Sequence, residues 1–167
     1  MNLWQTLSRL FASIVRQPPR VVLDTNILIS ATLAEQGFSA KIFRAARHQK
    51  IRVIISEYIL TEYSNVMRRP HIAKKYRGID LQVDAVIRFL NVRATIVAPH
   101  KIEPIIPADP KDGAILACAI QGNAKYIVSG DEHLLQLGSY RGIKILSPRD
   151  FAITVLPANI PDLNSPN

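Results

Sequence analysis

The 167-residue sequence contains a single cysteine, Cys118, and this excludes a fold held together by disulfide bonds within the chain. A reducing compartment suits such a chain, so we expect a cytoplasmic protein. Cys118 lies in the apolar run 114–120, a position that favours a buried structural thiol over a nucleophile. No apolar run reaches the length needed to span a bilayer, so no transmembrane segment is expected.

Acidic residues are also scarce, because 13 Asp and Glu stand against 21 Lys and Arg and leave a net charge of +8. Such an excess favours polyanionic partners, namely RNA, DNA, an acidic protein or an anionic membrane surface. A basic surface that serves only solubility is the alternative. With 48% hydrophobic residues, the chain can form one globular domain with its own core.

Three signatures of other metal-binding or nucleotide-binding proteins are missing. No cluster of His and Cys suggests zinc, and the glycine-lysine signature of a P-loop is absent. A phosphatase of the haloacid-dehalogenase type has Asp-x-Asp after its first strand, whereas the third residue of the corresponding triplet here is Asn26. No internal repeat or shift in composition marks a second domain.

Short apolar runs alternate with amphipathic segments along the chain. Strands are expected at 20–24, 51–55, 94–98, 125–129 and 143–146. Helices are expected at 26–33, 39–48, 57–69, 80–91 (with Asp80 as its cap) and 112–121. Strands that are apolar throughout and alternate with helices typically form a parallel sheet covered on both faces. We therefore predict an α/β fold with a central, mostly parallel sheet of five strands.

The two ends of the chain lie outside this alternation. Residues 1–17 have apolar residues at helical spacing and should form an amphipathic helix that ends at Pro18. This helix is expected to pack on its own domain or on a second subunit, and adsorption to a membrane surface is the alternative. We divide the chain into an N-terminal extension at 1–19, a domain at 20–155 and a flexible tail at 156–167.

Four acidic residues are notable for their positions: Asp24, Glu62, Asp112 and Asp131. Asp24 and Asp131 follow predicted strands, so both should project from the carboxyl edge of the sheet, where open α/β sheets bind ligands. Carboxylate oxygens suit hard divalent cations such as Mg²⁺ or Mn²⁺. These positions predict a metal site in which the four acids are the ligands.

Glu62 and Asp112 each have a structural alternative. Apolar residues lie three or four positions from Glu62, namely Tyr58, Ile59 and Val66. This spacing predicts that Glu62 faces the core, where an ionised carboxylate is costly unless it is paired or bound to metal. A salt bridge would also satisfy it. Asp112 opens a predicted helix, where the helix dipole alone favours an acid.

Small polar and basic residues complete the predicted site. Thr25, Asn26 and Ser129 lie close to the acids along the chain and are suited to hydrogen-bond metal-bound water or the ligand carboxylates. Phosphate contacts are expected from Lys41, Arg44, Arg68, Arg69, Lys74 and Lys75. For any one of these basic residues, a solvated charged face is the alternative.

With these residues in place, the chain resembles the PIN-domain ribonucleases, in particular the bacterial group described as toxin components of toxin–antitoxin systems. The matching segments are 20–31, 56–70, Asp109-Pro110-Lys111-Asp112, 126–131 and 142–151. The family pattern places its metal-binding acids on Asp24, Glu62, Asp112 and Asp131. Asp109 matches a further frequent acid, whereas Gly113 departs from the pattern because relatives often have a polar or acidic residue there.

The resemblance implies a three-layer α/β/α fold and a Mg²⁺- or Mn²⁺-dependent endoribonuclease that leaves a 5′-phosphate. The four acids would be its catalytic residues, with Asp109 as a supporting residue and the basic residues as RNA contacts. It also implies an RNA substrate, a cognate antitoxin protein and a homodimer. A non-catalytic PIN-fold module that binds RNA or protein, and a housekeeping RNA-processing nuclease, are the alternatives.

Overall fold

The computed structural model describes residues 17–98 and 110–160; Asp109, the predicted helix up to residue 16 and the chain after residue 160 lie outside the described residues. The strands are β1 (Arg20–Leu23), β2 (Arg52–Ser56), β3 (Thr95–Val97), β4 (Tyr126–Val128), β5 (Ser139–Tyr140) and β6 (Ile143–Leu146). The helices are α2 (Thr25–Leu33), α3 (Phe38–Arg47), α4 (Glu57–Met67), α5 (Pro70–Lys75), α6 (Ile79–Arg93), α7 (Pro110–Gln121), α8 (Glu132–Leu137) and α9 (Pro148–Thr154).

The strands form one sheet in the order β3-β2-β1-β4-β6-β5, and every pair is parallel except β5 with β6. The predicted α/β class and mostly parallel sheet are confirmed, and all five predicted strands form. The predicted number of strands was wrong by one. A two-residue strand such as β5 is too short to give an apolar run or an alternating pattern, so the sequence offered no signal for it.

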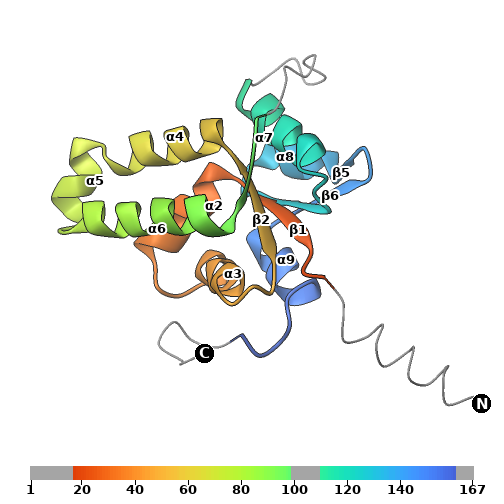
Figure 1. The fold of residues 1–167 in the computed structure, drawn as a ribbon, viewed down its shortest axis with the longest axis horizontal. Helices are drawn as coiled ribbons and strands as arrows, with labels where there is room; N and C mark the ends of the chain where they lie inside the picture. The colour runs from red at the N-terminus through yellow and green to blue at the C-terminus, as the bar shows by residue number, and fades with distance from the viewer. Residues whose placement is uncertain (1–16, 99–109, 161–167) are drawn as a thin grey trace, which may run out of the picture.

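Both faces of the sheet are covered by helices. Neighbouring side chains of a strand point to opposite faces of the sheet. Successive residues are nevertheless buried in β1 (Val21, Val22 and Leu23) and in β2 from Val53 onward, so neither face is open to solvent there. The helices flank the sheet on two sides, with α7 and α8 on one and α3 with α9 on the other (Figure 1). This is the three-layer arrangement that the resemblance implied.

The direction of chain travel reverses at β1. The chain builds β1, β2 and β3 toward one edge of the sheet and then returns through α7 to place β4 on the other side of β1. In open α/β sheets such a reversal leaves a crevice at the carboxyl ends of the two strands, where ligands bind. We therefore expect a ligand-binding site in the crevice between β1 and β4.

The end of α7 lies directly against β2. The helix stops at Gln121, as predicted from the Gly122-Asn123 pair, and Asn123 has a positive φ of 48°. A Cβ atom at Gly122 would lie 2.1 Å from Cγ2 of Ile54, which is far inside van der Waals contact. Arg20 Nε also donates a hydrogen bond to the Gly122 carbonyl at 2.7 Å. Gly122 is thus required for close packing, while Asn123 has the left-handed conformation at the end of the helix.

Cys118 is a buried structural thiol, as predicted. Its side chain is fully buried in α7, and burial raises the pKa of the thiol to about 12, although a hydrogen bond with Ser56 opposes this shift. A thiol with this pKa stays protonated at neutral pH and is a poor nucleophile.

Several helix boundaries differ from prediction. α6 begins at Ile79 with Gly78 as its N-cap, so Asp80 is a first-turn acid and not the cap. α5, α8 and α9 were not predicted, because helices of six or seven residues are too short to show helical periodicity. No helix within the described ranges is long and apolar enough to cross a membrane.

Core contacts continue past residue 155, where the domain was predicted to end. Leu156 is buried, and Ile160 packs against the main apolar cluster. The first described residues of the predicted tail therefore belong to the packed domain.

Candidate active site

A cavity of about 140 Å³ lies at the carboxyl ends of β1 and β4. Its described lining residues are Asp24, Thr25, Asn26, Glu62, Lys111, Asp112, Ile115 and Asp131. All four predicted acids are among them. They come from the end of β1, the middle of α4, the first turn of α7 and the residue before α8, so the fold brings four distant carboxylates to one place.

Asp24 is held at the junction of the two central strands. Its backbone N–H donates to the Val128 carbonyl at 3.0 Å, and its Oδ2 accepts a hydrogen bond of 2.6 Å from Ser129 Oγ. Burial raises the pKa of the Asp24 carboxyl; hydrogen bonds from Ser129 and from the backbone oppose the shift, and the charge of Glu62 adds to it. A cation in the cavity would lower this pKa, because it favours the charged form.

Glu62 lies at the border of the core and does not face it, so the predicted orientation was wrong. The buried stripe of α4 consists of Ile59, Tyr63 and Met67, while the side chain of Tyr58 is 44% exposed. Glu62 is on the neighbouring stripe, and 20% of its side chain remains accessible. Tyr58, counted as apolar in the sequence, shifted the apparent centre of the apolar face toward Glu62.

Both oxygens of Glu62 have partners within the protein. Thr25 Oγ1 donates to Oε2 at 2.6 Å, and Lys111 Nζ lies 3.1 Å from Oε1. The salt bridge that sequence considerations left open is therefore present. Lys111 itself was missed, since a lysine at the start of a helix gives no local sign of a partner 49 positions earlier in the chain. The sequence did indicate one thing, namely that Lys111 directly precedes the predicted metal-binding residue Asp112.

Asp112 is buried, with only 4% of its surface exposed, in the first turn of α7. That helix begins at Pro110, two residues earlier than predicted. An acid that served only the helix dipole would gain from solvent exposure, because burial penalises its charge. The helix dipole alone therefore does not explain this placement, and the function of Asp112 as a metal ligand stays a prediction.

Asp131 has a structural function in addition to its place in the cavity. Its Oδ1 accepts a hydrogen bond of 2.8 Å from the backbone N–H of His133, which makes Asp131 the N-cap of α8. Its own backbone N–H donates to Ser129 Oγ at 3.0 Å. Ser129 thus contacts both strand-end acids: its hydroxyl donates to Asp24 and accepts from Asp131.

The residues predicted to support the acids have different surroundings. Thr25 and Ser129 are buried and each donates a hydrogen bond to a cavity carboxylate, the contact expected of such residues. Asn26 lines the cavity and is exposed. Their part in orienting metal ligands stays a prediction, as does that of Asp109.

The donor set of the cavity fits a hard divalent cation, because carboxylate oxygens are the ligands that Mg²⁺ and Mn²⁺ prefer. Among the residues that the structure describes, no three His, Cys, Asp or Glu side chains are already spaced around a common centre. Hydrogen bonds and the ion pair with Lys111 hold the carboxylates of Asp24, Glu62 and Asp131 toward protein partners. Thr25 and Ser129 each engage only one oxygen of Glu62 and Asp24, so these two hydrogen bonds can be kept when the other oxygen binds an ion.

Arg69 is the predicted phosphate-binding residue that shares a surface with the acids. With Glu62 and Asn65 it lines a hollow of about 570 Å³ along α4. Arg68 is next to it but pairs with Asp80 at 3.2 Å and with Asp84 at 2.5 Å. The charge of Arg68 is thus largely neutralised by these two aspartates.

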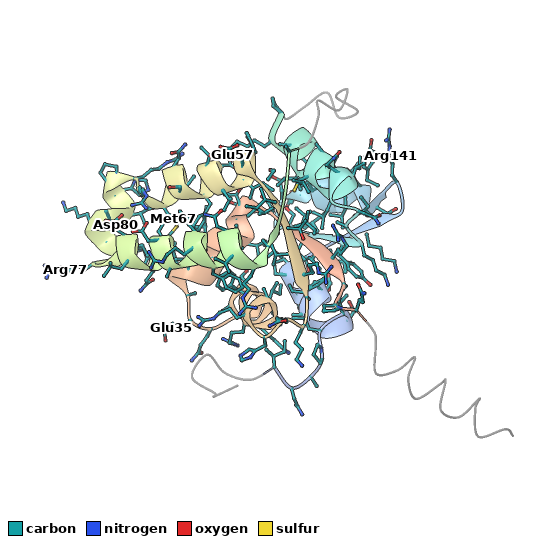
Figure 2. The ribbon with its side chains drawn as sticks, viewed as in Figure 1. Glu35, Glu57, Met67, Arg77, Asp80 and Arg141 are labelled. Atoms are coloured by element: carbon teal, nitrogen blue, oxygen red, sulfur yellow. The ribbon has the colours of Figure 1, made fainter. Side chains whose placement is uncertain are left out.

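The remaining predicted phosphate contacts lie away from the cavity. Lys74 and Lys75 belong to α5, at the opposite end of α4 from α7; Figure 2 labels Glu57 near α7 and Arg77 beyond α5. Arg44 of α3 donates from Nη1 to the Glu35 carbonyl at 3.0 Å, and Lys41 is one turn earlier on the same helix. Phosphate binding by these residues stays a prediction.

Comparison with known proteins agrees with this geometry. The model of the family described as "PIN domain" matches residues 20–133. Among solved structures, VapBC2 from Rickettsia felis, crystallised with a DNA fragment from its promoter, has a TM-score of 0.50 to this chain. The two are 16% identical, and the match covers 77% of this chain and 98% of that chain, so it shows a shared fold. No curated protein sequence matches the chain. Because the family model spans most of the sequence and includes all four cavity acids, this protein belongs to the PIN domain family.

Proposed function

We propose that the protein is an endoribonuclease that hydrolyses RNA phosphodiester bonds with Mg²⁺ or Mn²⁺. The observation that carries this proposal is the convergence of Asp24, Glu62, Asp112 and Asp131 on one cavity at the carboxyl edge of the sheet. Membership of the PIN domain family supports nuclease chemistry. The net charge of +8 supports a polyanionic substrate, since local acidity would otherwise repel RNA.

The cavity residues have distinct functions in this proposal. The four carboxylates would hold the cation, which when bound polarises the scissile phosphate and lowers the pKa of the attacking water. Thr25 and Ser129 fix the orientation of Glu62 and Asp24 through their hydroxyl groups. None of the described histidines lines the cavity, and in this proposal the reaction needs no dedicated general base.

The biological setting is proposed from the resemblance of the sequence motifs. We propose that the protein acts in the cytoplasm as the toxin of a toxin–antitoxin pair, that a cognate antitoxin protein binds it, and that it forms a homodimer. Induced expression should then arrest growth, and the substitution Asp24→Asn should abolish the arrest. Normal growth on induction of the unchanged protein would instead favour a housekeeping role in RNA processing.

The direct test is cleavage of RNA by protein freed of metal with EDTA. We expect no cleavage until Mg²⁺ or Mn²⁺ is restored, and products whose 5′-phosphate makes them substrates for a 5′-phosphate-dependent exonuclease. Tight RNA binding that EDTA does not affect, with no cleavage under any divalent cation, would contradict the proposal and favour a non-catalytic PIN-fold module.

Asp131→Asn should separate metal binding from helix capping. Asparagine caps helices about as well as aspartate, so α8 and the fold should be retained, whereas one negative ligand is lost. We expect cleavage, measured as kcat/KM on a fluorescent RNA, to fall about 10- to 100-fold, because Asp131 is one of four acids and is partly exposed.

A matched control for Asp131→Asn is available in α9. Like Asp131, Asp150 is an acid at the start of a helix, although it lies in the first turn and is not the N-cap; its Oδ2 accepts a hydrogen bond of 2.7 Å from Ser147 Oγ, and it does not line the cavity. Asp150→Asn removes the same charge and should leave kcat/KM unchanged. Equal activity of the two variants would argue against a function of Asp131 in the reaction.

A further inference from the structure

The acidic cavity contains its own positive charge. Among its described lining residues, Lys111 carries the only cationic side chain, and its Nζ lies 3.1 Å from Oε1 of Glu62. The backbone of Lys111 is fixed in the first turn of α7, next to Asp112. The amine is thus in the place where carboxylates of the proposed metal site converge.

The ion pair between Lys111 and Glu62 can break easily, so that Lys111 contacts another anion. The side chain of Lys111 is 64% exposed, and exposed ion pairs are weak because water screens them. A lysine ammonium is a compact charge on a flexible stem, so it can leave one anion for another without a change in backbone. Thr25 holds the other oxygen of Glu62, which keeps the carboxylate in the cavity while Oε1 changes partner.

A divalent cation and the ammonium of Lys111 compete for the same oxygen. A cation held by several carboxylates gains more from Glu62 than a single screened lysine does. Once displaced, the ammonium remains beside the cavity, where the nearest anion that RNA supplies is a phosphate. The ammonium that neutralises Glu62 before a cation binds can therefore contact a substrate phosphate afterwards.

We propose that Lys111 is an internal counterion that occupies Glu62 until a divalent cation displaces it, and that it then binds a phosphate of the RNA. This inference rests on the proposed function, because it takes a divalent cation and RNA as the ligands of the cavity. It makes Lys111 a positioning residue with opposite effects on the two ligands: it weakens metal binding and strengthens RNA binding.

The test is a pair of binding measurements on Lys111→Gln. Titration of Mn²⁺ into EDTA-treated protein, followed by calorimetry or by the EPR signal of free Mn²⁺, should show binding about threefold to tenfold tighter than in the wild type. Binding of a cleavage-resistant phosphorothioate RNA in Mn²⁺ should be about threefold to tenfold weaker. Lys111→Arg keeps the charge and should stay close to the wild type in both measurements.

Two controls assign the effect to the contact with Glu62. Lys50 is exposed and lies before β2, at the amino edge of the sheet, so Lys50→Gln changes the net charge equally and should leave Mn²⁺ affinity unchanged. In a Glu62→Gln background, Lys111→Gln should no longer tighten Mn²⁺ binding, because the competing ion pair is already gone.

The outcomes separate this inference from the proposed function. If the wild type binds Mn²⁺ and cleaves RNA but Lys111→Gln binds Mn²⁺ no more tightly, the counterion function is wrong and the nuclease proposal stands. If Lys50→Gln raised the affinity for Mn²⁺ equally, the effect would be one of net charge, and the inference would be wrong as well. If the wild type binds no Mn²⁺, both proposals fail.

Discussion

Asp24→Asn is expected to lower RNA cleavage about 1000-fold, equivalent to roughly 4 kcal/mol of transition-state stabilisation. Asp24 is the most centrally placed of the acids, since it ends β1 at the crevice and is bonded to Ser129 and to the Val128 carbonyl. Asparagine preserves the shape and one acceptor oxygen but removes the charge that a cation requires. The measurement is kcat/KM in saturating Mn²⁺.

The same substitution should stabilise the metal-free protein. Burial raises the pKa of Asp24 above its ordinary value of 3.8, so the folded protein holds this proton more tightly than the unfolded chain does. Stability is therefore lost as the pH rises from the ordinary pKa through the raised one, and the loss persists at neutral pH. Asparagine carries no such charge, and we expect Tm in EDTA to rise by about 2–4 °C.

Two controls make this result specific to Asp24. The gain in Tm should shrink as the pH is lowered below the raised pKa, because Asp24 of the wild type is then neutral as well. Added Mn²⁺ should raise the Tm of the wild type but not that of Asp24→Asn. A variant that loses activity together with stability would indicate a damaged fold and would count against a charge-based function of Asp24.

Gly122→Ala, directly after α7, should lower stability by about 3 kcal/mol, or Tm by about 6–12 °C. The added Cβ would lie 2.1 Å from Cγ2 of Ile54 and 3.0 Å from the Cys118 carbonyl oxygen. Ile54 is fully buried in the centre of β2, so neither the strand nor the helix can move away without disturbing the core. Urea unfolding would measure the effect.

Gly113→Ala is the matched control, because it makes the same change near the start of α7, the helix that Gly122 follows. Nothing lies within 4 Å of a Cβ at Gly113, and alanine is the better helix former. Gly113→Ala should be neutral or stabilising by about 0.5–1 kcal/mol. If Gly122→Ala were equally well tolerated, the close approach of α7 to β2 would not be a real constraint.

The position of an acid after a strand predicts where it lies in space, and this explains why Asp24 and Asp131 were placed well from sequence. The carboxyl ends of parallel strands meet at one edge, whatever the distance along the chain. Gly122 was likewise predicted as the end of a helix. Its approach to Ile54 could not be predicted, because the contact depends on how closely α7 packs on the sheet.

Features that depend on tertiary contacts were predicted poorly. Helical periodicity placed Glu62 toward the core, because it treats Tyr58 as buried, whereas 44% of Tyr58 is exposed. The pairing of Lys111 with Glu62 joins two helices that are far apart along the chain, and no local pattern encodes it. Ser129 was expected near one acid, but its contact with both strand-end acids depends on the pairing of β1 with β4.

The order of the cavity acids along the chain has a consequence for protein synthesis. Asp24, Glu62 and Asp112 are translated before Asp131, and β4, which ends just before Asp131, must pair with β1 before the four can meet. A growing chain cannot assemble the complete cavity until residue 131 has left the ribosome. If the protein cleaves RNA as proposed, this activity cannot arise before that point of synthesis, because β4 must first pair with β1.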